Sequence, residues 1–223
     1  GRWLGAGAGS IGLDGEVTSA QIDALVRGVN PVTGDSLGQR VGKVAALDLT
    51  FSAPKSVSLL AELADPAIRQ AVRDGHDQAV AATVGLLESE GVLVGRRGPA
   101  GSHQIPTVGA VTAGFVHRTS RAGDPQLHTH LLVFNRAQGL DGRWGALDSR
   151  RIFGWAKTAG YVYQAALRAE LSERLGVAWR PVANGTADLA GISETQLEAF
   201  STRRAQIETA MATAGHTTAR AAQ

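Results

Sequence analysis

The segment LHTHLLVFN, residues 127–135, constrains the fold of this chain more than any other stretch. Its run of apolar residues is typical of a strand inside a hydrophobic core, yet it carries His128 and His130 one residue apart. Side chains of a strand alternate between the two faces of a sheet, so both imidazoles should leave the sheet on the same side. The segment therefore predicts a buried strand that presents two histidines to one face.

A third histidine, His117, ends the preceding predicted strand, TVGAVTAGFVHRT (residues 107–119). If the two strands pair as a hairpin, His117 lies almost opposite His128, and His130 follows two residues further along the same face. Three converging imidazoles provide three ligands of a tetrahedral or octahedral metal site and leave positions for water or substrate. Imidazoles accept zinc, nickel or cobalt readily, whereas magnesium and manganese are the more abundant ions in cells, so the pattern predicts a divalent cation of open identity.

Asp48 stands in the middle of a second apolar strand, KVAALDLTFS (residues 43–52). Leu47, Leu49 and Phe51 share one face of this strand, and Asp48 lies on the other. A carboxylate in such a place needs a cationic or hydrogen-bonding partner. The partner is either an arginine or a metal-bound imidazole, which Asp48 would orient or assist as a base. The remaining histidines, His76, His103 and His216, are expected at the surface.

Positive charge is concentrated around the predicted histidine site. Residues 96–151 contain eight arginines and three aspartates, an excess of five positive charges in a chain whose net charge is +2. The planar guanidinium suits phosphate groups, so the cluster favours a polyanionic partner over a merely solvated surface. Zero cysteines exclude disulfides and thiolate chemistry and fit the cytoplasm, and no stretch of about twenty apolar residues predicts membrane insertion.

The whole pattern predicts one α+β domain, an antiparallel β-sheet with helices packed against it. Glycine-rich residues 5–17 read as an irregular lead-in, and their G-x-G-x-x-G spacing is a weak dinucleotide fingerprint, because no strand is expected before it and no βαβ unit after it. Helices are expected at residues 18–30, 55–63, 66–90, 150–175 and 193–214. Further strands are expected at residues 91–98, 142–148 and 177–182.

Two long motifs, LDLTFSAPKSVSLL (47–60) and GFVHRTSRAGDPQLHTHLLVFN (114–135), closely resemble the conjugative relaxases of the TrwC/TraI type, the MobF class of the HUH endonucleases. GAGAGSIGLDGEV, DGRWGALD and YVYQAALRAEL agree with that family in order and spacing. The resemblance implies one relaxase domain over residues 1–223 in the bacterial cytoplasm. It also implies that the family's tyrosine-bearing first strand, whose loss would leave an unpaired sheet edge, and its C-terminal helicase are missing.

The resemblance implies metal-dependent binding of single-stranded DNA at an origin of plasmid transfer, with site- and strand-specific nicking by tyrosine transesterification. By motif position, His117, His128 and His130 are the metal ligands, and Asp48 is the active-site aspartate. Lys55 and Arg121 match basic motif positions, and we place them, with Arg118 and Arg143, against the DNA backbone. Expected partners besides DNA are the missing N-terminal or helicase portions and conjugation accessory proteins.

The two tyrosines of the chain, Tyr161 and Tyr163, both fall within the helix expected at residues 150–175. A nucleophile must come within about 3–3.5 Å of phosphorus and in line with the leaving group, so neither is expected to be the nucleophile. Tyr163 matches a packing tyrosine of the family. Two alternatives stay open: a non-catalytic single-stranded-DNA-binding remnant or regulatory module of the same fold, and a zinc hydrolase that uses water, for which no H-E-x-x-H motif is present.

Overall fold

A four-stranded antiparallel sheet forms the centre of the fold in the computed structural model, which describes residues 1–38, 43–202, 205–206 and 209. The strands are ordered β1-β5-β6-β2, so the two outer strands come from the N-terminal quarter of the chain. Their bounds are β1 Arg2–Leu4, β2 Ala46–Ser52, β5 Thr112–Thr119 and β6 Pro125–Phe134. The α+β class predicted from the sequence is confirmed.

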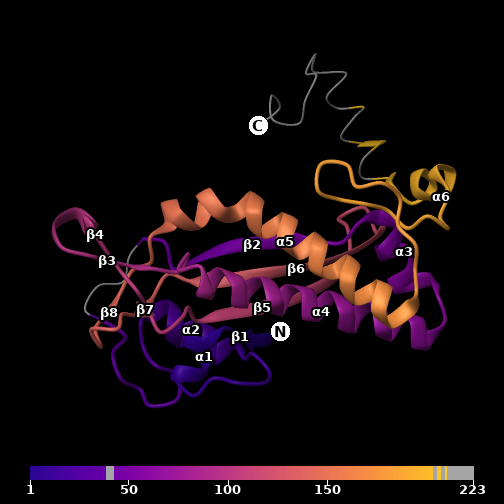
Figure 1. Cartoon of the computed structure of the whole chain (residues 1–223). Coiled ribbons are helices and arrows are strands. Elements are labelled where there is room, and N and C mark those ends of the chain that lie inside the picture. The colour runs from indigo at the N-terminus through magenta and orange to yellow at the C-terminus, as the bar shows by residue number, and fades with distance from the viewer. Residues whose placement is uncertain (39–42, 203–204, 207–208, 210–223) are drawn as a thin grey trace.

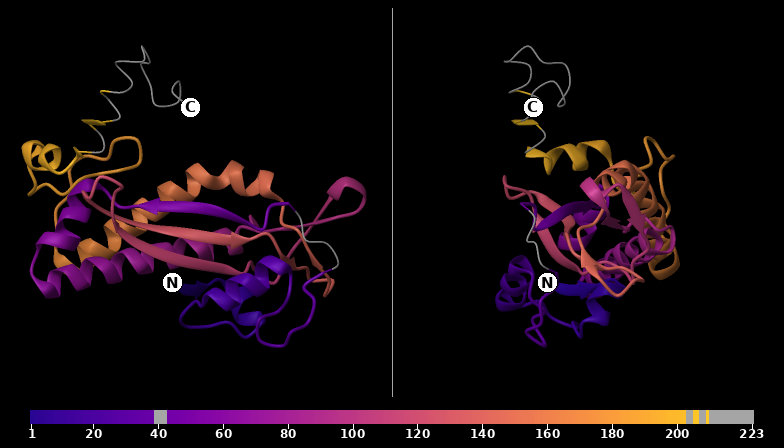
Figure 2. Two further views of the ribbon diagram at one scale, coloured as in Figure 1. Left: turned by 180° about the vertical axis from the view of Figure 1, so that it is seen from behind. Right: turned by 90° about the vertical axis from the view of Figure 1, so that its left-hand side faces the viewer.

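Three helices cover one face of this sheet (Figure 1, Figure 2). They are α3 (Lys55–Leu63), α4 (Pro66–Ser89) and α5 (Ser149–Leu175). Leu47, Leu49 and Phe51 of β2 pack into the core between the layers, as the alternation predicted, together with Leu127 and Leu131 of β6. Each such apolar side chain contributes about 1.5–3 kcal/mol when fully buried, so this layer anchors the register of β2 and β6.

Within the part of the chain that the structure describes, the opposite face of the sheet is covered at one end only. The N-terminal segment, with α1 (Ala6–Ser10) and α2 (Ser19–Arg27), packs there around Trp3, Leu25 and Phe134. His117, on the same face of β5, stays exposed, and His130 is half-buried. The sheet therefore offers an open surface at the end where β5 finishes and β6 begins.

The glycine-rich lead-in differs from the expectation of an irregular segment. A strand, β1, precedes it and pairs antiparallel with β5, and residues 6–10 form the short helix α1. A Cβ at Gly7 would lie 2.5 Å from the carbonyl carbon of Ala110. The glycine is thus needed for a close approach of two backbones, which gives the fingerprint-like spacing a packing role.

The long helices were predicted well, and their ends follow local chemistry. Gly28 and Gly176 adopt the left-handed conformation, with φ of 78° and 62°, and end α2 and α5. For α2 this stop comes at Arg27, earlier than residue 30. Thr18 caps the start of α2 through a reciprocal capping box with Gln21. Within the described residues, no helix combines the length and apolar character that crossing a membrane requires.

The short elements were predicted less well. The strand expected at residues 91–98 is shorter in the structure: β3 spans Gly95–Arg97 and pairs with β4 (His103–Ile105), next to the 3-10 turn η1 (Pro99–Gly101). The strand expected at residues 142–148 is also shorter: β8 spans Trp144–Gly145 and pairs with β7 (Ala137–Gln138). The strand expected at 177–182 is wrong: it is reduced to one bridge between Trp179 and Leu189, and Pro181 lacks the N–H that a ladder needs. The last helix, α6, spans Glu194–Ala199, and much of its expected continuation to residue 214 lies outside the described residues.

Candidate metal centre

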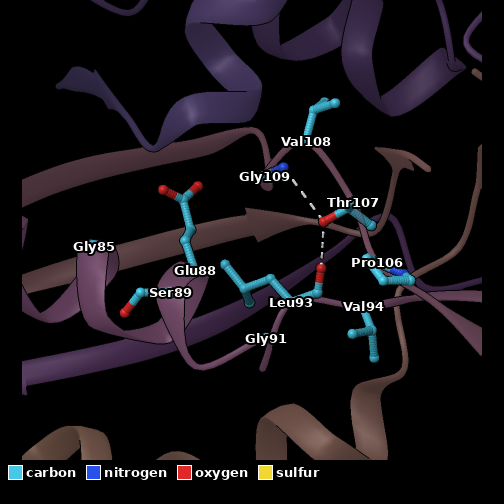
Figure 3. Close-up of a pocket in the computed structure, with 10 residues that line it drawn as sticks. All are labelled: Gly85, Glu88, Ser89, Gly91, Leu93, Val94, Pro106, Thr107, Val108 and Gly109. Carbon is cyan, nitrogen blue, oxygen red and sulfur yellow. Dashed lines mark hydrogen bonds between the residues drawn. The ribbon is translucent and has the colours of Figure 1, made fainter. Parts of the chain in front are cut away.

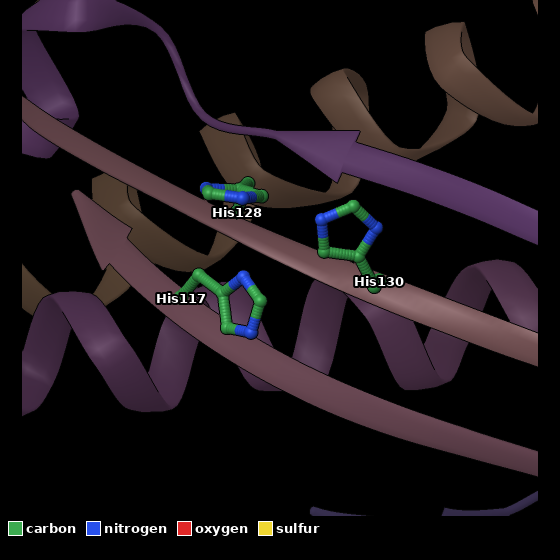
Figure 4. A group of neighbouring side chains, drawn as sticks. All are labelled: His117, His128 and His130. Atoms are coloured by element: carbon green, nitrogen blue, oxygen red, sulfur yellow. The ribbon is translucent and has the colours of Figure 1, made fainter. Parts of the chain in front are cut away.

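Three imidazoles meet on the open face of the sheet (Figure 4). His117 and His128 are direct cross-strand partners, and His130 follows two residues along β6 on the same face. The ring centroids are 5.1–5.2 Å apart in every pair, and one nitrogen from each ring lies within 4.8 Å of the others. The convergence arises because a hairpin of the predicted register puts all three side chains on one side.

Hydrogen bonds fix the orientation of two of the rings. Nδ1 of His130 lies 2.7 Å from Oδ2 of Asp48, and Nδ1 of His128 lies 2.9 Å from the carbonyl oxygen of Gln126. A carboxylate at neutral pH and a carbonyl can only accept, so both rings carry their proton on Nδ1. The lone pair of each Nε2 therefore stays available for a ligand.

The partner of Asp48 is an imidazole, and among the described residues no arginine pairs with this carboxylate. Asp48 reaches diagonally across the β2–β6 ladder, because Thr50, two residues further along β2, is the direct partner of His130. The hydroxyl of Thr50 lies 3.3 Å from the same Nδ1. Of the two partners considered from the sequence, the geometry selects the histidine.

The surroundings of His117 favour a neutral ring at this position. The pKa of His117 is held below its usual value, first because neighbouring groups displace water around the ring, and then because His128 and His130 oppose a further positive charge. Asp48 acts in the opposite direction. A neutral imidazole is the form that binds a metal ion, so this donor set fits a divalent cation held by three nitrogens.

The SAPKSVS motif holds the start of β6 in place. The backbone N–H of Leu127 donates to Oγ of Ser58 at 3.0 Å, and the ammonium of Lys55 donates to the carbonyl oxygens of Pro125 and Phe200 at 2.9 and 2.7 Å. Burial lowers the pKa of Lys55, and Asp124 partly offsets this. Lys55 thus ties α3 to the start of β6 and to the end of α6.

The other cations predicted to contact DNA are spread over the molecule. Arg121 lies in the exposed turn between β5 and β6, at the same end of the sheet as the three histidines. Arg118 turns toward α3, where its Nε lies 3.9 Å from a carboxylate oxygen of Glu62. Arg143 belongs to the β7–β8 hairpin, beyond the opposite end of β6. Arg121 thus lies in the turn at the histidine end of the sheet, Arg118 directs its side chain toward the helix layer, and Arg143 lies beyond the other end of β6.

His76 is a correction to the sequence analysis, which placed it at the surface. The side chain is fully buried, with Nδ1 2.7 Å from the hydroxyl of Tyr163 and Nε2 2.7 Å from Oγ1 of Thr129. Burial lowers the pKa of His76 to about 4. Its helical spacing from Val72 and Val80 placed it on the apolar face of α4, and this was the signal that sequence reasoning missed.

The remaining predicted residues are placed as follows. His103 is exposed on β4, as expected, and His216 lies outside the described residues. Tyr163 is 1% exposed and packs against Phe51, with ring centroids 5.4 Å apart, so it lies on the helix side of the sheet, away from the three histidines. Tyr161 is partly exposed on α5, beside Lys157.

A separate hollow of about 530 Å³ lies between the end of α4 and residues 106–109 (Figure 3). Its carboxylate, Glu88, accepts a hydrogen bond from the backbone N–H of Ala6 at 2.9 Å. Burial raises the pKa of Glu88, and the backbone hydrogen bonds oppose that change. The carboxylate ties α4 to α1, and none of the three histidines lines this hollow, so the candidate site is the open face of the sheet.

Comparison with known proteins gives one consistent picture. The family model of the TrwC relaxase matches residues 1–223. The multifunctional conjugation protein TraI of Escherichia coli is 35% identical over 226 residues, which cover 94% of this chain and 12% of TraI, so the chain spans about one eighth of that relative. Two solved structures of the conjugative relaxase TrwC were also found. The complex with mutant oriT DNA has a TM-score of 0.86 and 38% sequence identity, and the match covers 98% of this chain and 78% of that one. The metal-bound complex with oriT DNA has a TM-score of 0.83 and 39% identity, and the match covers 96% of this chain and 74% of that one.

Proposed function

Because the chain belongs to the TrwC relaxase family, we propose that it is the DNA-processing domain of a conjugative relaxase in the bacterial cytoplasm. It binds single-stranded DNA at an origin of transfer and nicks one strand at a specific site by tyrosine transesterification. The observation that carries the proposal is the convergence of His117, His128 and His130 beside Asp48 on the open face of the sheet. A solved structure of TrwC contains both oriT DNA and a bound metal, and this supports the proposal that the present chain binds DNA and a cation.

In the proposed site each of the three histidines gives one nitrogen to a divalent cation. Magnesium or manganese is proposed as the cellular ion, and zinc, nickel or cobalt as ions that the same imidazoles accept. Bound there, the cation would polarise the scissile phosphate and offset the negative charge that develops on its oxygens. Asp48 accepts a hydrogen bond from the Nδ1–H group of His130, which fixes the tautomer and the direction of that ring.

DNA reaches this site along the open half of the sheet face. Arg121, exposed in the turn after β5, is the first of the predicted cations to meet a neighbouring phosphate. Arg118 and Arg143 stay predictions as DNA contacts; Arg118 also faces Glu62, and Arg143 bonds the protein through its backbone. Lys55 was also predicted to contact DNA, but its ammonium already donates to two backbone carbonyl oxygens, so we propose that it holds the start of β6 instead. Conjugation accessory proteins and further segments of a longer relaxase are proposed as protein partners.

The proposed nucleophile is a tyrosine outside residues 1–223. Both tyrosines of the chain belong to α5, and the ring of Tyr163 is buried against α4 on the helix side of the sheet. Neither hydroxyl is therefore directed at the histidines. In the cutting step the phenolic oxygen bonds to phosphorus as the bond from phosphorus to the 3′ oxygen breaks. The phenolic proton passes to solvent or a nearby base, and the 3′ oxygen takes up a proton.

The test uses a labelled single-stranded oligonucleotide that carries an origin of transfer. We expect binding by this chain with manganese present, and a covalent adduct only when a synthetic N-terminal relaxase segment with its tyrosines is added. His128→Ala and His130→Ala should abolish the adduct. If the DNA affinity is the same with and without the cation and in both variants, and no mixture gives an adduct, the non-catalytic DNA-binding module is supported instead. Cleavage to a free 5′-phosphate by this chain alone would support a hydrolase.

A further inference from the structure

We propose that Thr129, His76 and Tyr163 form a positioning chain, which fixes the directions of His128 and His130 from behind the sheet. The inference rests on the proposed function, because it treats both histidines as ligands of a divalent cation. The three residues lie on the helix side of the sheet and act on the site through the backbone of β6.

The geometry links one strand residue to two helices. Thr129 stands between the two histidines, so its side chain leaves β6 on the opposite face. Its Oγ1 lies 2.7 Å from Nε2 of His76 on α4, and Nδ1 of His76 lies 2.7 Å from the hydroxyl of Tyr163 on α5. The peptide units on either side of Thr129 are those that carry the two histidines.

Because Thr129, His76 and Tyr163 are buried, each hydrogen bond between them is necessary. His76, Tyr163 and Thr129 are 0%, 1% and 2% exposed, so water does not replace a lost partner. A buried donor or acceptor without a partner costs about 1–3 kcal/mol. Because burial lowers the pKa of His76 to about 4, its ring is neutral at pH 7. A neutral imidazole has one donor and one acceptor, which match two hydroxyls in either tautomer.

Thr129 lies in the middle of the sheet, so its orientation affects the strands on both sides of β6. It is the direct partner of Val116 on β5 and of Phe51 on β2, and the ring of Phe51 packs on Tyr163. Apolar packing alone has no directional preference, whereas a hydrogen bond fixes both a distance and an angle. The polar chain therefore holds the twist of β6 where two ligands leave it, and a small rotation there would separate their nitrogens.

Two substitutions at Thr129 separate positioning from packing. Thr129→Val keeps the shape and loses the hydroxyl, whereas Thr129→Ser keeps the hydroxyl and loses a methyl group. In calorimetric titration with manganese and with zinc at pH 7, Thr129→Val should weaken binding about tenfold, and Thr129→Ser should bind like the unsubstituted chain. Tyr163→Phe should act in the same direction as Thr129→Val. If Thr129→Ser weakens binding more than Thr129→Val does, packing is the role and the proposal is overturned.

Two further measurements complete the test. Val84→Ala removes apolar contacts of α4, so it lowers the free energy of unfolding but leaves the hydrogen bonds of His76 in place. The cation affinity of this variant should stay unchanged. In the metal-free protein, the ring NMR signals of His128 and His130 should move in Thr129→Val, while those of exposed His103 stay in place. Unmoved signals with unchanged affinity overturn the proposal. No cation uptake by the unsubstituted chain refutes the proposed function, and the ring signals then decide the positioning separately.

Discussion

Oδ2 of Asp48 lies 2.7 Å from Nδ1 of His130, across a strand pair in which the two residues are not direct partners. The contact joins a carboxylate of β2 to a ring of β6, and so it couples the edge strand to the histidine site. A carboxylate behind an imidazole raises the basicity of the nitrogen that faces a metal ion.

Asp48→Asn tests this coupling. The amide keeps the size of the side chain but removes the negative charge, so cation affinity should fall by about tenfold to a hundredfold. Calorimetric titration with manganese measures the change, and Asp14→Asn, at an exposed aspartate in the N-terminal segment, is the matched control. Equal affinities for both variants would show that the carboxylate does not support His130.

His76 predicts how stability depends on pH. Its pKa is about 4 in the folded protein and 6.5 in its unperturbed state, so below pH 6.5 the unfolded chain binds more protons. The free energy of unfolding should therefore fall as the pH drops from 6.5 toward 4, by about 3 kcal/mol, and the His76 contribution should level off below pH 4. Urea unfolding at several pH values, compared between the unsubstituted chain and His76→Gln, measures this. An identical pH slope in the variant contradicts the prediction.

Lys55 and Arg121 should differ in their effect on DNA binding. Lys55→Gln breaks two hydrogen bonds to backbone carbonyls, so the free energy of unfolding should fall by about 1–3 kcal/mol, while the salt dependence of single-stranded DNA binding stays the same. Arg121→Gln should leave stability unchanged and reduce the slope of log affinity against log salt by about 0.7. Fluorescence anisotropy at several salt concentrations measures the salt slope of each variant, and urea unfolding measures its stability. A reduced slope for Lys55→Gln would instead assign it a phosphate contact.

Gly7 and Gly9 form a matched pair in α1. Gly7→Ala puts a Cβ 2.5 Å from the backbone of Ala110, so the structure must shift, at a cost of about 1–3 kcal/mol. A Cβ at Gly9 meets nothing within 4 Å, and alanine is the better helix former, so Gly9→Ala should be neutral or stabilising by up to about 1 kcal/mol. Thermal unfolding compares the two. Equal losses would mean that the close approach of α1 to Ala110 does not limit this position.

Much of the candidate site could be predicted because it depends on local periodicity. The alternation of β6 put His128 and His130 on one face, and the length of the β5–β6 connection put His117 opposite His128. The same logic separated Asp48 from the apolar face of β2. Helices α3, α4 and α5 followed from long apolar repeats, which specify a helix more strongly than short segments specify a strand.

What the sequence alone determined is therefore the α+β class, the long elements and the face on which each strand residue lies, since these follow from repeats of two or 3.6 residues along one segment. The tertiary structure alone decided which partner Asp48 takes, that Lys55 bonds two backbone carbonyls, that β1 forms before the glycine-rich lead-in and α1 within it, and that His76 meets Thr129 and Tyr163. Each of these depends on groups far apart in the chain. Which polar groups meet is set by the packing of whole layers, and no local pattern encodes it.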